Sequence, residues 1–110
     1  MVKLTLKNLK EIKDEISRDE FKNSWEGKRK YVEEYFKNYD KPLTLEVIVN
    51  NDGKVYKVSV SLNLKSKKLL HAEEDKDLMK ATSRLFSEFR KQMKKQKELE
   101  RKDYLYKRKR

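Results

Sequence analysis

The chain has 110 residues, enough for one domain with a modest core; with 45% charged and 35% hydrophobic residues, that core requires apolar side chains sorted onto one side of each element. Its 30 Lys and Arg against 19 Asp and Glu give a formal charge of +11, which favours polyanionic partners such as nucleic acid or an anionic membrane surface. The absence of Cys excludes disulfides and thiolate metal sites, and no stretch resembles a signal peptide or the roughly 20 apolar residues of a membrane span, so we expect a cytoplasmic protein without a membrane segment.

The first half of the chain predicts a strand followed by a helix. Val2, Leu4 and Leu6 alternate with polar residues, which indicates a strand with one buried face. Residues from about 17 to 38 carry aromatic and aliphatic side chains mostly at steps of three, four or seven, which is typical of an amphipathic helix. The segment Asp40-Lys41-Pro42 ends this helix, because Pro disfavours helical geometry in the residue before it.

The middle of the chain predicts a β-hairpin. Residues 43–50 alternate in polarity, and residues 55–64 do so most cleanly, with the even-numbered side chains on the apolar face. Asn51-Asp52-Gly53 between them indicates the turn, since Gly adopts a positive φ without steric cost.

The last third predicts a short strand and a long helix. We expect the strand over residues 68–73, with Leu70 and Ala72 directed inward, and the helix over about 75–102. The whole chain then forms a single α+β domain in the order β-α-β-β-β-α, a four-stranded sheet with two helices packed on one face, similar to double-stranded-RNA-binding domains. We place this domain at residues 1–102 and a basic tail without structure of its own at 103–110, because adjacent cations repel one another.

The positive charge is concentrated on the last helix. Residues 77–110 have 13 Lys and Arg against 5 Asp and Glu, a net charge of +8, and the other 76 residues carry only +3. On a helical wheel one side of this helix is suited to pack on the sheet. That side comprises Leu78, Ala81, Thr82, Leu85, Phe89, Gln92, Met93, Gln96 and Leu99.

Two neighbouring stripes of cations are then directed outward from this helix. The first comprises Lys80, Arg84, Lys91, Lys95 and Lys102, and the second comprises Arg90, Lys94, Lys97 and Arg101. Lys28, Arg29 and Lys30 form another basic cluster on the first helix, and all of these make one patch if both helices lie on the same face of the sheet. Such a surface is either a solvated face or one that follows phosphates, in which case binding should weaken steeply with salt.

Three local motifs carry a resemblance to a known family. The first strand contains Leu4-Thr5-Leu6-Lys7, and the first helix closes with Val32-Glu33-Glu34-Tyr35-Phe36. The most specific motif comprises Leu70-His71-Ala72, Asp77-Leu78-Met79, Ala81, Lys91-Gln92-Met93, Lys95 and Lys97. In these residues the chain resembles, over most of positions 1–102, the ribosome hibernation-promoting factor family, which includes ribosome-associated inhibitor Y. Met79 stands where that family often has Tyr, and Lys91 stands where it usually has Arg.

The resemblance implies a stress-response factor that stops translation. Such a factor binds the small ribosomal subunit and its ribosomal RNA between head and body, overlapping the positions of messenger RNA and of A- and P-site transfer RNA. We expect a monomer on the ribosome, of the short class without the C-terminal domain that pairs two ribosomes. The expected RNA-binding residues are Lys28, Arg29, Lys30, His71, Lys80, Arg84, Arg90, Lys91, Lys94, Lys95, Lys97, Arg101 and Lys102.

Other functions are less well supported by the residues. His71 is the only His and has no acid or nucleophile partner at a catalytic spacing, so it is either an RNA contact or an ordinary sheet position. We expect no enzyme activity, cofactor, metal or small-molecule substrate. Two alternatives stay open: a generic binder of structured RNA, and a protein-interaction module in which the last helix pairs with an acidic helix. The aromatic residues of the first helix belong to the core by their spacing, with Tyr31 directed outward.

Overall fold

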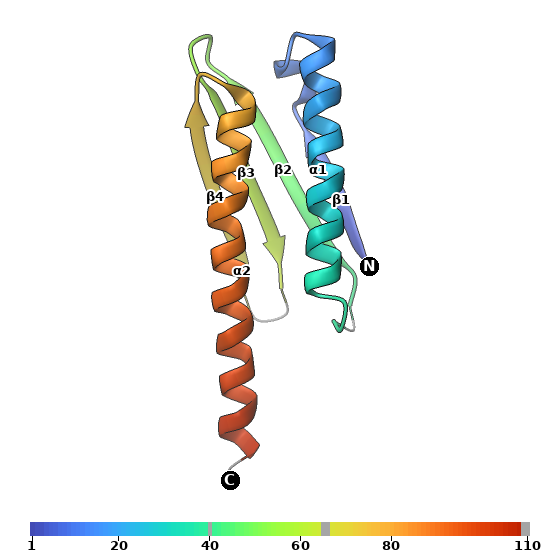
Figure 1. Cartoon of the computed structure of the whole chain (residues 1–110), viewed down its shortest axis with the longest axis vertical. Helices are drawn as coiled ribbons and strands as arrows, with labels where there is room; N and C mark the ends of the chain where they lie inside the picture. The colour runs from blue at the N-terminus through green and yellow to red at the C-terminus, as the bar shows by residue number, and fades with distance from the viewer. Residues whose placement is uncertain (40, 65–66, 109–110) are drawn as a thin grey trace.

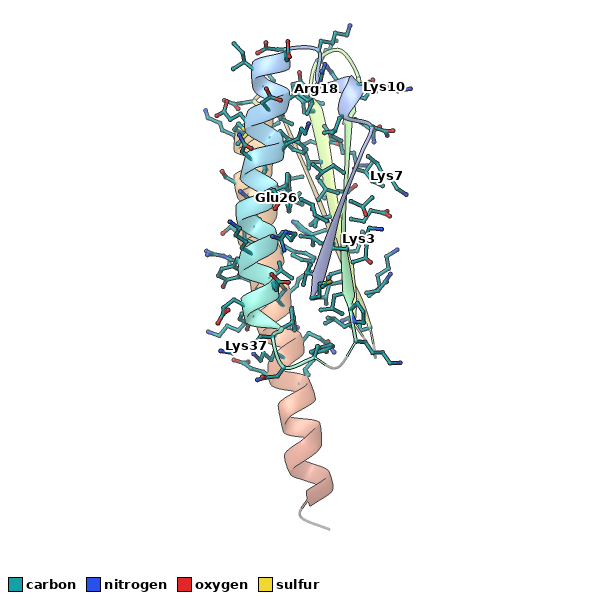
Figure 2. The ribbon with its side chains drawn as sticks, turned by 90° about the vertical axis from the view of Figure 1, so that its right-hand side faces the viewer. Lys3, Lys7, Lys10, Arg18, Glu26 and Lys37 are labelled. Atoms are coloured by element: carbon teal, nitrogen blue, oxygen red, sulfur yellow. The ribbon has the colours of Figure 1, made fainter. Side chains whose placement is uncertain are left out.

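Two helices cover one face of a four-stranded sheet, and the other face of the sheet is open (Figure 1; Figure 2). The computed structural model describes residues 1–39, 41–64 and 67–108, with side chains as far as residue 99. In chain order the elements are β1 (Val2–Lys7), the short 3-10 helix η1 (Leu9–Glu11), α1 (Glu15–Tyr35), β2 (Leu43–Asn51), β3 (Tyr56–Asn63), β4 (Lys68–Asp75) and α2 (Leu78–Arg108).

The sheet has the spatial order β1-β2-β3-β4. β1 runs parallel to β2, and the other neighbours are antiparallel. A parallel pair needs a crossover connection, which α1 supplies, whereas the antiparallel pair β2–β3 needs only a short turn. The α+β class and the element order predicted from the sequence are therefore confirmed.

The β2–β3 turn follows its sequence prediction closely. Gly53 has a φ of 97°, in the region that disfavours side chains. A side-chain oxygen of Asp52 accepts hydrogen bonds of 2.9 Å from the backbone N–H groups of both Lys54 and Val55. These bonds lower the pKa of Asp52, the bond from Val55 contributing most. The carboxylate thus stabilises the turn more strongly in its ionised form.

The core lies between the inner face of the sheet and the two helices. Alternate residues of β2 and β3 are fully or almost fully buried, as the alternation predicted, and so are the helix positions that oppose them. The strand residues are Leu43, Leu45, Val47, Val49, Val58, Val60 and Leu62. The helix residues are Phe21, Trp25 and Val32 of α1 and Leu78, Ala81, Thr82, Leu85, Phe89, Met93 and Gln96 of α2.

The predicted phase of β4 is wrong. Leu69 is 2% exposed and Leu70 is 60% exposed, so the face assigned to the core is the open one, and Ala72 is exposed as well. Leu69 pairs with Leu62, and His71 pairs with Val60. Directly paired residues share a face, and a shift of one residue moves every side chain to the other face. His71 therefore lies on the helix-covered side of the sheet.

The helix ends also differ from the predicted limits. α1 begins at Glu15, because Asp14 accepts hydrogen bonds from the backbone N–H and the hydroxyl of Ser17, and it ends at Tyr35. The segment expected to end it includes Asp40, which lies outside the described residues. α2 continues to Arg108, so the proposed tail at 103–110 starts as a continuation of the helix. Leu99 is 50% exposed rather than packed. Figure 1 shows that the last part of α2 runs on past the sheet.

Candidate nucleic-acid interface

Aromatic side chains of α1 contact α2 at Phe86. The ring centroid of Phe86 lies 5.9 Å from that of Trp25 and 5.7 Å from that of Tyr31, both in edge-on geometry. Tyr35 continues the row at 6.1 Å from Tyr31. We call Trp25, Tyr31, Tyr35 and Phe86 the aromatic seam. It brings the outer surfaces of α1 and α2 together, as expected for two helices on one face of the sheet.

Phe86 is the seam residue that the sequence analysis missed. It is 8% exposed, and it lies beside the stripe of α2 that packs on the sheet. Its ring contacts α1 through Trp25 and Tyr31. A helical wheel drawn for α2 alone shows which residues are apolar but not that a second helix lies beside this position.

Three cations lie over rings of the seam. The Nζ of Lys28 is 5.7 Å from the ring centroid of Trp25 and 5.5 Å from that of Phe86. The guanidinium carbon of Arg90 is 5.6 Å from the centroid of Tyr31, and the Nζ of Lys97 is 4.6 Å from that of Tyr35. Cations over aromatic faces are held electrostatically, and their stems cover apolar surface. The seam thus orders a row of positive groups between the helices.

Lys28 is the most enclosed of these cations. Its Nζ donates a hydrogen bond of 2.6 Å to the hydroxyl of Ser24, and partial burial lowers the pKa of the ammonium group. The Nε1 of Trp25 nearby is buried without a hydrogen-bond partner within the described residues. Lys28 therefore contributes both to the packing of the seam and to its charge.

Arg29 and Lys97 are used within the fold. Arg29 forms ion pairs with Glu26 at 3.1 Å and with Glu33 at 3.2 Å, and these acids raise its pKa. Glu33 also accepts a hydrogen bond from the backbone N–H of Val2, which is the main reason why its pKa is lowered. This group connects α1 to β1. Lys97 donates to the backbone carbonyl of Tyr35 at 2.8 Å.

Arg84 is neutralised by acids at the corner between β4 and α2. Its Nη2 lies 2.9 Å from a carboxylate oxygen of Asp75, and its Nε lies 3.7 Å from Glu73. Glu73 also lies 2.8 Å from the Nε2 of His71. The pKa of Asp75 is lowered, mainly by the backbone N–H of Asp77 and then by Arg84. Of the predicted RNA contacts, Arg84 and His71 thus have partners inside the molecule.

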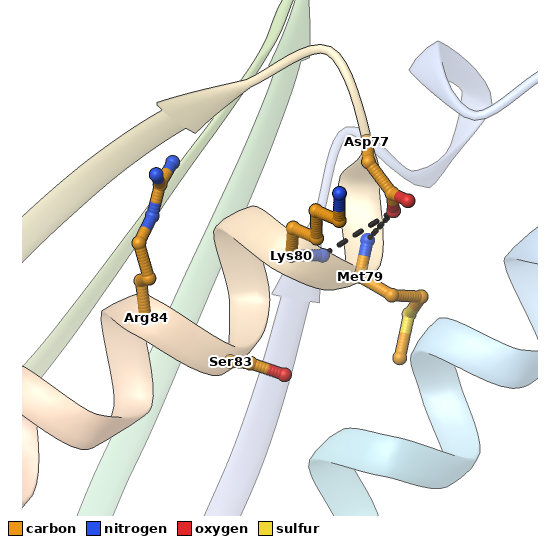
Figure 3. Close-up of a pocket in the computed structure, with 5 residues that line it drawn as sticks. All are labelled: Asp77, Met79, Lys80, Ser83 and Arg84. Atoms are coloured by element: carbon orange, nitrogen blue, oxygen red, sulfur yellow. Dashed lines mark hydrogen bonds between the residues drawn. The ribbon is translucent and has the colours of Figure 1, made fainter.

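An open depression lies beside this corner at the start of α2 (Figure 3). It is lined by Asp77, Met79, Lys80, Ser83 and Arg84. The free N–H groups of a helix start can bind an anion, but here Asp77 already accepts hydrogen bonds from the N–H groups of Met79 and Lys80. Nor do His, Asp and Glu groups among the described residues form a cluster suited to a metal ion.

The remaining predicted cations point outward. Lys91 is exposed and pairs with Glu88 at 3.1 Å, a contact that contributes little because both side chains are solvated. Lys30, Lys80, Lys94 and Lys95 are exposed and have no ion-pair partner in the part of the chain that the structure describes. We call these four residues the free cations. Arg101 and Lys102 lie outside the described side chains.

The comparison with known families matches most of the chain. The model of the family described as sigma 54 modulation protein / S30EA ribosomal protein matches residues 19–101. The matched segment runs from the first turns of α1 into α2 and includes the aromatic seam and all the free cations. Among curated proteins, none matches the chain. Neither helix, over its described residues, has an apolar stretch that would let it cross a bilayer.

Proposed function

This chain belongs to the sigma 54 modulation protein / S30EA ribosomal protein family, and from that membership we propose that it is a ribosome hibernation factor that binds the small ribosomal subunit and inhibits translation. The family is one of ribosome-associated modulation factors and is not a known enzyme family. The match agrees with the resemblance noted from the motifs around His71 and Lys91. In the proposed mode of action the protein lies between the head and body of the subunit in the cytoplasm, where it occupies the positions of messenger RNA and of A- and P-site transfer RNA.

The observation that carries this proposal is the distribution of charge around α2. The buried side of the helix holds Leu85, Phe89 and Met93, whereas Lys94 and Lys95 are exposed and have no ion-pair partner among the described side chains. Unpaired cations neutralise phosphates and release their counterions, which drives association with RNA. A helix evolved only for solubility would mix its signs so that neighbouring charges pair.

The seam adds order to this surface. Lys28 and Arg90 are placed against rings, so less side-chain entropy is lost when they meet a phosphate. Both helices therefore contribute to one RNA-binding surface in the proposal, and β4 does not, because His71 is turned toward the helices and paired with Glu73. The proposed effect is steric exclusion by a monomer bound to ribosomal RNA.

Co-sedimentation with purified small subunits over a series of salt concentrations tests the proposal. The test variant is Lys94→Glu with Lys95→Glu. The matched control is Lys3→Glu with Lys68→Glu, which makes the same change of charge on exposed residues of the strands; Figure 2 shows Lys3 pointing away from the helices. We expect the test variant to lose most of its binding and the slope of log affinity against log salt to fall by about two, while the control keeps both.

Three outcomes would contradict the proposal. The unaltered protein fails to co-sediment at low salt, the two double variants lose binding equally, or bound protein does not exclude transfer RNA from the subunit. Equal affinity for small subunits and for any RNA duplex would favour the alternative, a generic binder of structured RNA.

A further inference from the structure

Tyr31 is the aromatic side chain that the seam leaves open to solvent. It is 40% exposed, whereas Trp25 is fully buried and Phe86 is 8% exposed. It stands on α1 next to Val32, which faces the core. An exposed aromatic side chain amid cations offers a surface that a planar group can contact.

The ring of Tyr31 is held in place from both helices. It lies nearly parallel to the ring of Tyr35, at an interplanar angle of 19°. The ring of Phe86 in α2 meets it edge-on at 80°. Because its neighbours fix its plane, little conformational freedom is lost when another group stacks on it.

A guanidinium group lies over the same ring. The Cζ of Arg90 is 5.6 Å from the ring centroid of Tyr31. Arg90 is exposed and has no carboxylate partner in the described part of the chain, so its N–H donors remain available. One helical turn further along α2 is Lys94, which is one of the free cations. A planar aromatic, a planar cation and a point charge thus follow one another on this surface.

We propose that Tyr31 and Arg90 form a platform on which an unpaired nucleobase of RNA stacks, with Lys94 beside the flanking phosphate. Aromatic rings and guanidinium planes are the two side-chain surfaces on which unstacked RNA bases settle. A surface that only followed phosphates would need the charges but not the ring. The inference rests on the proposed RNA-binding function and adds to it a single-stranded element, such as a loop or bulge, as the target.

The test measures binding of the full chain to short oligouridine by fluorescence anisotropy, against the same oligonucleotide with abasic riboses. Both probes carry the same phosphates, so their difference reports stacking. We expect the unaltered protein to bind the abasic probe about tenfold more weakly. Tyr31→Phe should keep that preference, and Tyr31→Leu should remove it. Equal binding of the two probes by the unaltered protein would overturn the platform.

A second pair of variants protects the test against loss of folding in Tyr31→Leu. Arg90→Lys keeps the charge and removes the guanidinium plane, so it should reduce the preference for bases while total charge is unchanged. The platform would be refuted if the two single variants, Arg90→Lys and Tyr31→Leu, both kept the full preference for the probe with bases. So would full displacement of oligouridine by polyglutamate at matched charge, because an acidic protein partner would then fit as well.

The two proposals fail separately. A preference for bases without co-sedimentation with small subunits would leave the platform standing and overturn the proposed ribosomal function. Co-sedimentation without any preference for bases would support the proposed ribosomal function and overturn the platform.

Discussion

The ammonium group of Lys97 in α2 donates a hydrogen bond of 2.8 Å to the backbone carbonyl of Tyr35, the last residue of α1. The same group lies 4.6 Å from the centroid of the Tyr35 ring. The carbonyl end of a helix is the negative end of its dipole, so a cation there is stabilising. Lys97 of α2 thereby caps the C-terminal end of α1. A cation that was expected to bind RNA thus has a structural role in the fold.

This relationship predicts that Lys97 contributes to stability. Lys97→Met should lower the free energy of unfolding by about 0.5–1 kcal/mol, because the carbonyl of Tyr35 loses its donor and the helix end loses its charge. Lys97→Arg should keep most of the stability of the unaltered protein. Lys95→Met is the matched control, since Lys95 is exposed without a partner in the described residues. Urea denaturation measures all three, and equal midpoints for the Lys97→Met and Lys95→Met proteins would disprove the role.

The phase of β4 predicts opposite effects for two adjacent leucines. Leu69→Ala should destabilise the protein by about 2–3 kcal/mol, because Leu69 is buried beside Leu62. Leu70→Ala should change stability by less than about 0.5 kcal/mol, since that side chain is 60% exposed. Thermal unfolding compares the two variants. A larger loss at position 70 would mean that β4 is paired one residue out of step.

The acids around Arg84 predict that it matters more for folding than for binding. Arg84→Gln should remove its contacts with Asp75 and Glu73 and lower the free energy of unfolding by up to about 1 kcal/mol, a modest effect because the pairs are solvated. Lys80→Gln, on the same face of α2, should leave stability unchanged and weaken binding to small subunits. The free energy of unfolding and the affinity for small subunits are both measured for each variant. The assignment is wrong if Arg84→Gln weakens binding more than Lys80→Gln does.

The carboxylates that accept backbone hydrogen bonds predict loss of stability in acid. Glu33 accepts from Val2, and Asp75 accepts from Asp77, and these bonds hold both pKa values below their usual range. The unfolded chain therefore takes up protons first as the pH falls. The stabilisation is complete above about pH 5 and is lost progressively as the pH falls through about 4 and below. Melting temperature measured against pH should show this decline.

Glu33→Gln supplies the control for the acid experiment. The amide cannot ionise, so the variant should be less stable at neutral pH and should lose less stability between neutral pH and acid. Parallel curves for Glu33→Gln and the unaltered protein would show that this carboxylate does not contribute to the acid response.

Local pattern was sufficient for much of the architecture. The alternation of β2 and β3, the turn at Gly53 and the packed side of α2 except for Leu99 were predicted correctly, because the repeat of a strand or helix is set by neighbouring residues alone. The helical wheel of α2 likewise predicted that Lys94 and Lys95 are directed outward. The motifs around His71 and Lys91 indicated the family because each is a short run of neighbouring residues in the chain.

The sequence by itself thus determined the elements, their order and the sign of the surface. Tertiary structure decided the phase of β4, because two adjacent leucines allow either alternation and only the pairing of Leu69 with Leu62 selects one. It also decided which cations face outward without partners. Arg84 and Lys97 meet groups on other elements, and Phe86 meets α1. Electrostatic and packing energies depend on the distances between atoms in space. The periodic pattern of residues within one element does not show how far that element lies from another element that is distant in the sequence.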